Sequence, residues 1–341
     1  MEHGDPTSEG GMVIDIGWTE LAHLCASAIT AAGADEPTTA ALTDAVIAAE
    51  RRGVPALGVA HLFDYLDAFR AGRLNGAATP VIARGRASVI TVSADDGVAQ
   101  LAYRSARSDL LEAVQRNGVA VLSISDSFPV GELAYYTADV AEHGFVALAA
   151  ANAPAMMSLY DVPAALTGTN PISFALPAQP SPRIIDQAAS VAAWVRIRDA
   201  AASGEPLPAG WALDAEGAAT TDAAAALLGP LLPFGQVKGS NIAMIGELLA
   251  VLSGARFAID APDFASGAEP TRVGLFLLAL DPAAFAGDYL ERVEAHLSRL
   301  HSRYGVDFGR HLAQVTQLQL SEPLHERLVA AAASAAEMRR N

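Results

Sequence analysis

The chain of 341 residues is 52% hydrophobic and carries a formal net charge of −16 at pH 7. This composition excludes a disordered or fibrous protein, and the length favours two lobes, each with its own core. Because the negative charge repels nucleic-acid phosphates and anionic lipid surfaces, we expect neither as a partner.

The N-terminal part of the chain is predicted to be helical after a flexible tail of residues 1–12. Apolar residues recur at helical spacing over residues 18–52, with a break at residues 35–37, and residues 57–69 predict a third helix. Cys25, the one cysteine, lies in an apolar helical stretch, which indicates core filling rather than a disulfide or a thiolate metal site.

From Ala87 onward the pattern is that of a mixed α/β domain. Helices are predicted at residues 98–117 and 132–143, and strands at the runs SVITVS, VAVLSI, FVALAAAN, ISFALP and RIID. A loop-rich segment, residues 203–239, precedes an apolar helix at residues 241–252. A further strand, GLFLLAL, and two C-terminal helices follow.

Neither a membrane span nor a secretion signal is predicted. The apolar runs are far shorter than the ~20 residues needed to cross a bilayer. The N-terminal MEHGDPTSEGG contains neither the basic nor the apolar segment of a signal peptide. We therefore expect a cytoplasmic protein.

The common nucleotide and hydrolase motifs are missing. No GxGxxG stands between a strand and a helix, and the sequence has no GxxxxGK[ST], HExxH or GxSxG. The eight histidines are scattered and none is paired at metal-ligand spacing, so we expect no metal site.

Lys238, the one lysine of the chain, suggests an anion site. It stands just before the cap-type residues Gly239, Ser240 and Asn241, which begin the apolar helix. Because a helix N-terminus is already positive, a lysine there is well explained by a bound phosphate or carboxylate. An ordinary solvated lysine explains the position equally well.

Two further segments suggest contacts with a flat ligand. In LTGTNPISFALP, Gly168 and the pair Asn170-Pro171 favour a tight turn that presents backbone N–H groups at a strand edge. In IIDQAAS, a strand ends on Asp186 and small residues lead to Ser190. Small side chains let a flat ring approach the backbone, but they are equally common at ordinary helix starts.

Read in order, these segments resemble the malate/L-lactate dehydrogenase family that lacks a Rossmann fold. This family includes ureidoglycolate, sulfolactate and diketogulonate dehydrogenases and piperideine-2-carboxylate reductase. The similarity runs from about Arg52 to Phe285. It rests on GRLNG (72–76), DDGVAQ (95–100), GTNP (168–171), DQAAS (186–190), GWALDAEGAATTD (210–222) and GPLLPFGQVKG (229–239), which leads into GELLAVLSGA.

The resemblance implies an α/β fold of the non-Rossmann malate/L-lactate dehydrogenase type. A mixed-sheet, cofactor-binding domain would span residues 121–285. A helical lobe for substrate binding and dimerisation would combine residues 13–120 and 286–341, so a homodimer is expected. The cofactor would be NAD or NADP, held by Thr169, Asn170, Asp186, Ala188, Ser190, Lys238 and Gly239.

The sequence departs from the family where the reaction should occur. The family carries Ser-His-Gly and, one turn on, an arginine for the substrate carboxylate, whereas this chain has PALGVAH, ending on His61. A second family histidine, the presumed proton donor, aligns with Pro129. Because a positioned acid contributes roughly 100- to 10,000-fold to a rate, and proline cannot act as one, ordinary lactate or malate turnover is not expected.

Another acid near positions 57 and 129, where the family has histidines, would have to supply the proton. The candidates for catalysis are His61, Glu132, Tyr135 and Asp186, with Asp126 and Ser127 as rival proton donors. His61 lies one turn after Leu57 on the same predicted helix face, and imidazole is a side chain suited to general acid catalysis, although a packing or surface role is more common for such a histidine. Burial in an apolar cleft would raise the pKa of Glu132.

Three functions follow from this pattern. The first is an NAD(P)H-dependent oxidoreductase that acts on a small carbonyl compound or a cyclic imine with an altered active site. The second is a catalytically inactive or non-redox descendant that binds a ligand or partner in the old cleft. The third, a purely structural interaction protein, does not explain why the polar turns persist.

Overall fold

The computed structural model describes residues 12–311 and 315–338. The tail expected at residues 1–12 lies outside the described residues except for Met12. The centre is an eight-stranded mixed sheet with the order β13-β9-β8-β5-β12-β4-β3-β2. In chain order its strands are β2 (Val81–Arg86), β3 (Val89–Ser93), β4 (Val119–Ser127), β5 (Val146–Ala151), β8 (Ile172–Leu176), β9 (Arg183–Gln187), β12 (Val273–Leu280) and β13 (Arg310–His311).

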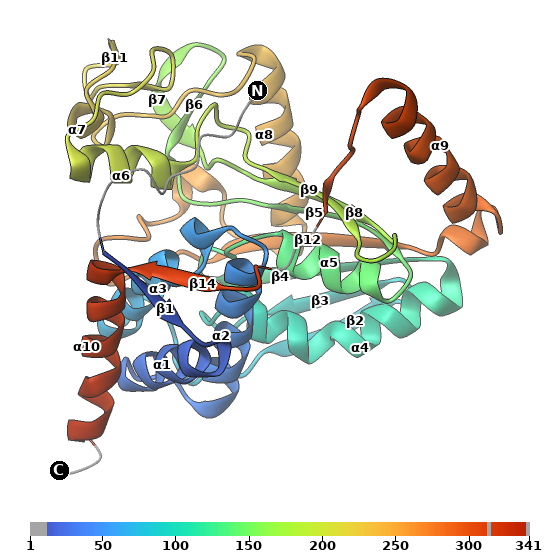
Figure 1. The fold of residues 1–341 in the computed structure, drawn as a ribbon, viewed down its shortest axis with the longest axis horizontal. Helices are drawn as coiled ribbons and strands as arrows, with labels where there is room; N and C mark the ends of the chain where they lie inside the picture. The colour runs from blue at the N-terminus through green and yellow to red at the C-terminus, as the bar shows by residue number, and fades with distance from the viewer. Residues whose placement is uncertain (1–11, 312–314, 339–341) are drawn as a thin grey trace.

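Helices cover both faces of this sheet (Figure 1). In the view, α4 (Ala99–Asn117) and α5 (Ala134–Glu142) lie below it, and α8 (Val237–Ala250) lies above it. Strands β3 and β4 run parallel, with Val89 opposite Val121, and α4 connects them as a crossover helix. The other neighbouring strands are antiparallel, so the predicted mixed sheet is confirmed.

Both ends of the described chain build the helical lobe, at the lower left of Figure 1. Its helices are α1 (Trp18–Ala31), α2 (Glu36–Arg51), α3 (Val59–Arg70) and α10 (Glu322–Met338). Strand β1 (Val13–Ile16) pairs antiparallel with β14 (Leu318–Ser321), and α10 packs against α1. The helices predicted at residues 18–52 and 57–69 are confirmed, and Cys25 is buried in the core of this lobe.

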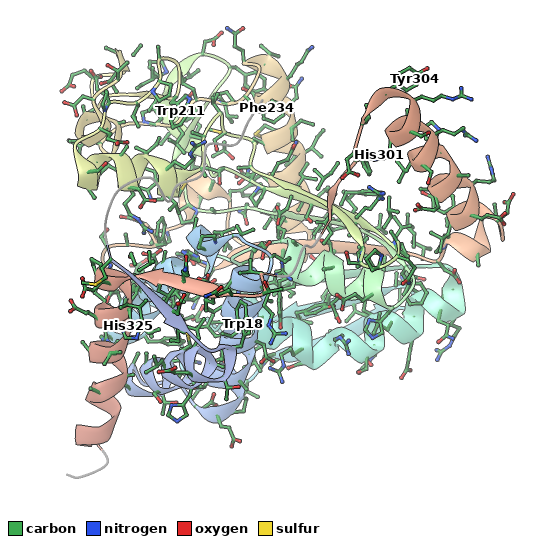
Figure 2. All side chains as sticks on the ribbon, in the orientation of Figure 1. Trp18, Trp211, Phe234, His301, Tyr304 and His325 are labelled. Atoms are coloured by element: carbon green, nitrogen blue, oxygen red, sulfur yellow. The ribbon has the colours of Figure 1, made fainter. Side chains whose placement is uncertain are left out.

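A third group of elements surrounds the start of α8. It consists of α6 (Trp194–Ser203), α7 (Ala223–Ala226) and the strand pairs β6 (Met157–Leu159) with β7 (Val162–Thr167) and β10 (Ala212–Leu213) with β11 (Ala219–Thr220). Trp211 and Phe234 pack against the apolar core of this group, in the upper part of Figure 2.

Helix α8 begins at Val237, four residues before the predicted start at 241. The chain turns into the helix at Gln236, whose φ is 56°. Gly239 then lies so close to Phe234 that a Cβ would stand 2.2 Å from the Phe234 carbonyl oxygen. Lys238 is therefore exposed within the first helical turn rather than before it, which corrects the predicted position.

The predicted ranges 13–120 and 286–341 contain elements from more than one part of the fold. The range 13–120 contains β2, β3 and α4, which belong to the sheet layer. Within the range 286–341, α9 (Tyr289–Tyr304) lies at the opposite end of the molecule from α10 (Figure 1). Tyr304, at the end of α9, is 72% exposed. None of the described helices is long and apolar enough to cross a membrane.

Candidate active site

A cavity of about 320 Å³ lies where the helical lobe meets the sheet and α6. Its titratable lining residues are His61, Asp64, Glu132 and Asp186. Most other lining residues are apolar, among them Val54, Leu57, Pro129, Leu133, Met156, Trp194, Val195 and Phe264. An apolar pocket with a few converging polar groups is the usual form of a small-molecule site.

The buried carboxylate of Glu50 fixes the start of α3 and with it the position of His61. Glu50 Oε1 accepts a hydrogen bond from the Val59 N–H at 2.7 Å. The same oxygen occupies the space beside Gly58, where a Cβ would stand 2.2 Å from it. Burial raises the pKa of Glu50, and the hydrogen bond from Val59 opposes this only in part. Glycine at 58 is therefore required for the approach of this carboxylate.

His61 is held in place by an acidic partner on the next turn of α3. Its Nδ1 lies 2.8 Å from Asp64 Oδ2. Arg198 of α6 reaches both oxygens of the same carboxylate from a different side, at 3.3 Å each. Burial alone would raise the pKa of Asp64, but the hydrogen bonds and charges of His61 and Arg198 outweigh it and hold the pKa below its usual value. The carboxylate orients the imidazole that faces the cavity.

Glu132 forms a bidentate ion pair with Arg52, the residue that follows α2. Arg52 Nε donates to both carboxylate oxygens at 3.1 and 3.0 Å, and Nη2 donates to Oε2 at 2.7 Å. The side chains are only 11% and 5% exposed. The guanidinium engages both oxygens of the carboxylate in charge-assisted hydrogen bonds. The arrangement gives Glu132 a role in holding two segments together.

Pro129 stands at the cavity wall in a loop that is fixed from behind. The buried hydroxyl of Tyr65 donates to the Pro129 carbonyl at 2.9 Å. Gln100 Nε2 and the Tyr136 hydroxyl both donate to the Val130 carbonyl, at 2.9 and 2.8 Å. The side chain at 129 therefore faces the cavity in a defined position and offers no proton.

The GTNP and DQAAS segments meet at the opposite wall. The Thr169 carbonyl accepts a hydrogen bond from the Ala189 N–H at 2.7 Å, which joins the two segments. Thr169, Asp186 and Ala188 all line the cavity. Asp186 Oδ2 accepts the N–H of Ala134, at the start of α5, at 2.7 Å. Three of the predicted cofactor residues thus lie in the same cavity as His61.

Asn170 and Ser190 are buried and do not line this cavity. Asn170 Nδ2 donates to the Ala243 carbonyl at 2.9 Å and to Glu247 Oε2 at 3.2 Å, both on α8. The Ser190 hydroxyl donates to the Ala192 carbonyl at 2.6 Å. Asn170 therefore ties its turn to α8, Ser190 stabilises the turn after β9, and neither side chain faces this cavity.

Tyr135 faces another hollow, which is lined by Arg51, Arg52, Arg104 and Arg107 among others. Burial raises the pKa of Tyr135 to about 12. The structure therefore does not bring its hydroxyl to the cavity that contains His61.

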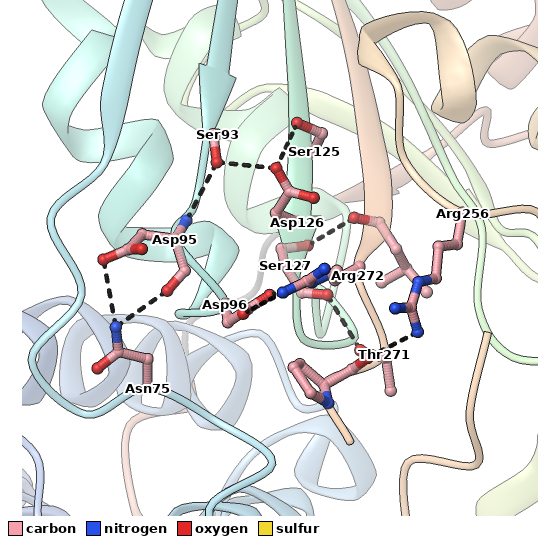
Figure 3. A network of polar contacts seen from close by, with 12 residues as sticks. Asn75, Ser93, Asp95, Asp96, Ser125, Asp126, Ser127, Arg256, Thr271 and Arg272 are labelled. Atoms are coloured by element: carbon pink, nitrogen blue, oxygen red, sulfur yellow. Dashed lines mark hydrogen bonds and ion pairs between the residues drawn. The ribbon is translucent and has the colours of Figure 1, made fainter.

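Asp126 and Ser127, the rival proton donors, belong to a separate network at the ends of β3 and β4 (Figure 3). Asp126 Oδ2 accepts hydrogen bonds from Ser93 and Ser125 at 2.8 and 3.2 Å. Ser127 Oγ donates to the Val273 carbonyl at 3.2 Å. Over the described ranges, no group of three or more His, Cys, Asp or Glu residues could hold a metal ion.

The same network anchors residues 256–272, the segment that carries Phe264 to the cavity wall. Arg272 donates to the two carboxylate oxygens of Asp96 at 2.7 and 2.9 Å (Figure 3). Arg272 and Asp96 both have positive φ, 54° and 56°. Such backbone persists where the surrounding structure fixes it, so the ion pair holds the end of this segment in place.

Sequence reasoning missed Asp64, Arg52, Trp194 and Phe264 as residues of the site or its support. Only Asp64 carried a usable signal, since it follows His61 by three residues on one helix and so faces the same way. Arg52 pairs with a residue 80 positions away, and Phe264 lies in a loop with no periodic pattern.

The whole fold is shared with a known group of proteins. A family model described as malate/L-lactate dehydrogenase matches residues 16–311. The structure is similar to that of Δ1-piperideine-2-carboxylate reductase from Pseudomonas syringae pv. tomato, with a TM-score of 0.87 and 30% identity, covering 93% of this chain and 99% of that one.

Relatives of known activity are also similar over most of their length. The chain is 35% identical to (2R)-3-sulfolactate dehydrogenase (NADP(+)) of Chromohalobacter salexigens, over 84% of this chain and 87% of the relative. It is 34% identical to Δ1-pyrroline-2-carboxylate/Δ1-piperideine-2-carboxylate reductase of Pseudomonas putida, over 81% and 82%. The order of motifs, the non-Rossmann sheet and these similarities agree, and the chain belongs to the malate/L-lactate dehydrogenase family.

Proposed function

We propose that the protein is an NAD(P)H-dependent oxidoreductase that acts on a small carbonyl compound or cyclic imine through an altered active site. One observation carries the proposal. The cavity brings Thr169, Asp186 and Ala188, from the two cofactor-type segments, to the same space as His61. A ligand held by those segments and a small molecule beside His61 would therefore be neighbours.

The residues present suit a nicotinamide ring. Small side chains, Ala153 and Ala188, leave room for a flat ring to approach the backbone, and Thr169 and Gln187 offer polar atoms for a carboxamide. The cavity of about 320 Å³ has room for this ring and a small substrate, but not for a whole dinucleotide. The phosphates would lie outside it, with Lys238 as a candidate contact.

When bound, the reduced nicotinamide supplies a hydride. The task of the protein is to bind and orient the substrate and to manage its proton. His61 is the lining group suited to proton exchange, because Asp64 holds its Nδ1 and leaves Nε2 to face a ligand. Glu132 is engaged by Arg52, and Tyr135 lies elsewhere.

The proposal includes an altered reaction centre. The stretch PALG, residues 55–58, supplies neither the serine nor the histidine of the family motif, and His61 replaces its arginine. Pro129 stands where the family has a proton donor. Turnover of lactate or malate should therefore be weak or absent.

A homodimer is also part of the proposal. Helix α8 leaves the apolar side chains of Ile245 and Leu248 51% and 53% exposed, and Leu252, just after the helix, is 65% exposed. A second copy that covers this face would bury them. Sedimentation at micromolar concentration should give about twice the chain mass of 35.2 kDa, and a mass of one chain would oppose this part of the proposal.

A catalytically inactive descendant that binds a ligand in the same cavity is the second candidate. It is favoured by Pro129, which stands where the family has a proton donor, and by Glu132, whose two carboxylate oxygens already accept three hydrogen bonds from Arg52. Titrations with NADH and NADPH, followed by nicotinamide fluorescence, decide between the two. We expect binding of one cofactor below millimolar concentration and its oxidation by an imine or ketone. Absence of binding at millimolar concentration would reject the oxidoreductase, and binding without turnover of any imine or ketone would favour the inactive descendant.

A further inference from the structure

We infer that the cavity selects a cationic substrate without a carboxylate, of the class of cyclic iminium ions and the amines formed from them. The inference rests on the proposed oxidoreductase function and specifies its substrate. Three observations support it: the charged residues at the cavity wall, the ion pairs that already occupy Arg52 and Arg198, and the chemistry of the reaction.

The charged groups at the cavity wall suit a cation. Asp64, Glu132 and Asp186 line it together with His61, and none of the described lining residues is lysine or arginine. Arg52 and Arg198 pair with two of these three carboxylates, so the group keeps one negative charge without counting His61, and no lining guanidinium or ammonium group is offered to a substrate anion. The relatives act on compounds whose names denote anions, sulfolactate and pyrroline-2-carboxylate. The wall of this cavity differs from what such substrates require.

Two arginines, Arg52 and Arg198, pair with carboxylates that line the cavity. Arg52 directs three hydrogen bonds at Glu132. Arg198 contacts both oxygens of Asp64. Either guanidinium would have to abandon a carboxylate before it could clamp the carboxylate of a substrate, and the abandoned carboxylate would then stand unpaired at the cavity wall.

Aromatic and aliphatic groups complete a site for a small ring. Trp194 and Phe264 both line the cavity, and the face of an aromatic ring attracts a cation. Leu57, Leu133 and Val195 provide apolar contacts for the methylene groups of a saturated or partly saturated ring.

The reaction of an iminium ion also suits this site. Its carbon accepts a hydride, the π electrons of the C=N bond become the lone pair of the nitrogen, and the positive charge disappears as the nicotinamide is oxidised. No proton is needed in that step, because the substrate nitrogen already carries its proton or substituent. A ketone, in contrast, needs a proton for the developing alkoxide. Proline at 129 is therefore no obstacle to iminium reduction.

The first test is binding without the cofactor. Titration calorimetry at about pH 7.5 compares piperidine, an ammonium ion at that pH, with piperidine-2-carboxylate and cyclohexanecarboxylate. We expect piperidine to bind at least ~10-fold more tightly than either carboxylate, as charge-assisted contacts imply. Equal or tighter binding of a carboxylate by a protein that still binds NADH or NADPH would overturn the inference and leave the oxidoreductase standing.

The second test places a guanidinium in the cavity. His61→Arg should reverse the preference, weakening piperidine and strengthening piperidine-2-carboxylate by ~10-fold or more. His23→Arg, the same change at an exposed histidine of α1, is the matched control and should alter neither affinity. An unchanged preference in His61→Arg would oppose the charge argument. Piperidine binding by a protein that binds neither NADH nor NADPH would overturn the oxidoreductase and the iminium substrate with it.

Discussion

The guanidinium of Arg52 holds the carboxylate of Glu132 through Nε, at 3.1 and 3.0 Å from the two oxygens, and through Nη2, at 2.7 Å. Arg52 follows α2 of the helical lobe, and Glu132 precedes α5 of the sheet layer. The ion pair thus joins the two halves of the molecule beside the cavity. Because both side chains are almost fully buried, the loss of one leaves the other without its counter-charge.

The first prediction concerns this pair. Glu132→Gln should lower the free energy of unfolding by about 3 kcal/mol, since Arg52 then remains buried without a carboxylate. Urea denaturation measures the loss. Arg70→Gln, which breaks an exposed ion pair with Asp67, is the control and should cost less than about 1 kcal/mol. A stable Glu132→Gln protein that had lost turnover would instead support Glu132 as the proton donor.

The second prediction separates the possible roles of His61. His61→Ala should lower kcat by about 100-fold with a ketone, which needs a proton, and far less with a cyclic iminium ion, which does not. Steady-state kinetics with both substrate types give the comparison. Glu132→Gln, assayed at a temperature where it is folded, is the companion variant. If both variants keep full kcat with a ketone, neither residue supplies the proton.

The third prediction tests the anion contact at α8. Lys238→Ala should weaken NADH or NADPH binding by about 1 to 3 kcal/mol if the ammonium group contacts a phosphate. Fluorescence titration measures the dissociation constant. Arg86→Ala, at an exposed position of β2, removes one positive charge without touching α8 and should have little effect. Unchanged affinity in Lys238→Ala would mark the lysine as an ordinary solvated side chain.

The fourth prediction uses the buried Glu50. Its pKa is raised above the ordinary value of 4.5, chiefly by burial, so the folded protein binds more protons than the unfolded chain just above that pH. Stability is therefore lost as pH rises through the interval between the unfolded and folded values. Glu50→Gln retains an acceptor for the Val59 N–H and avoids the buried charge.

This variant should be more stable than the natural protein by about 1 kcal/mol near pH 8, and the difference should vanish below about pH 4. Urea denaturation at several pH values provides the profile. Glu112→Gln, at an exposed position of α4, is the control and should show no such profile. A destabilised Glu50→Gln protein at every pH would show that the charge itself holds the start of α3.

Much of the fold could be predicted from local patterns. The spacing of apolar residues predicted α1 to α5 and the central strands, and the order of the motifs predicted the family. Part of the site could also be predicted, because Thr169, Asp186 and Ala188 stand in recognisable turns. In the structure these three residues line one cavity.

The remaining features depend on contacts that no local pattern records. Lys238 lies inside α8 rather than before it, because Gln236 adopts a positive φ and the helix starts four residues earlier than its apolar residues predicted. The Asn170 side chain points into the protein, because Nδ2 donates to the Ala243 carbonyl and to Glu247 Oε2. Both acceptors belong to α8, more than seventy residues further along the chain. Such pairings form only in the folded molecule, so side-chain direction in a turn could not be predicted from the turn itself.

The closure of the helical lobe by both ends of the chain has a consequence for synthesis. Strand β1 pairs with β14, and α1 packs against α10, so this face of α1 stays uncovered until residues 318–338 have been translated, although α2 covers another face earlier. The central strand β12 also comes late, at residues 273–280, so neither layer is complete before most of the chain has been synthesised. During translation the N-terminal helices therefore expose apolar surface that the finished fold buries.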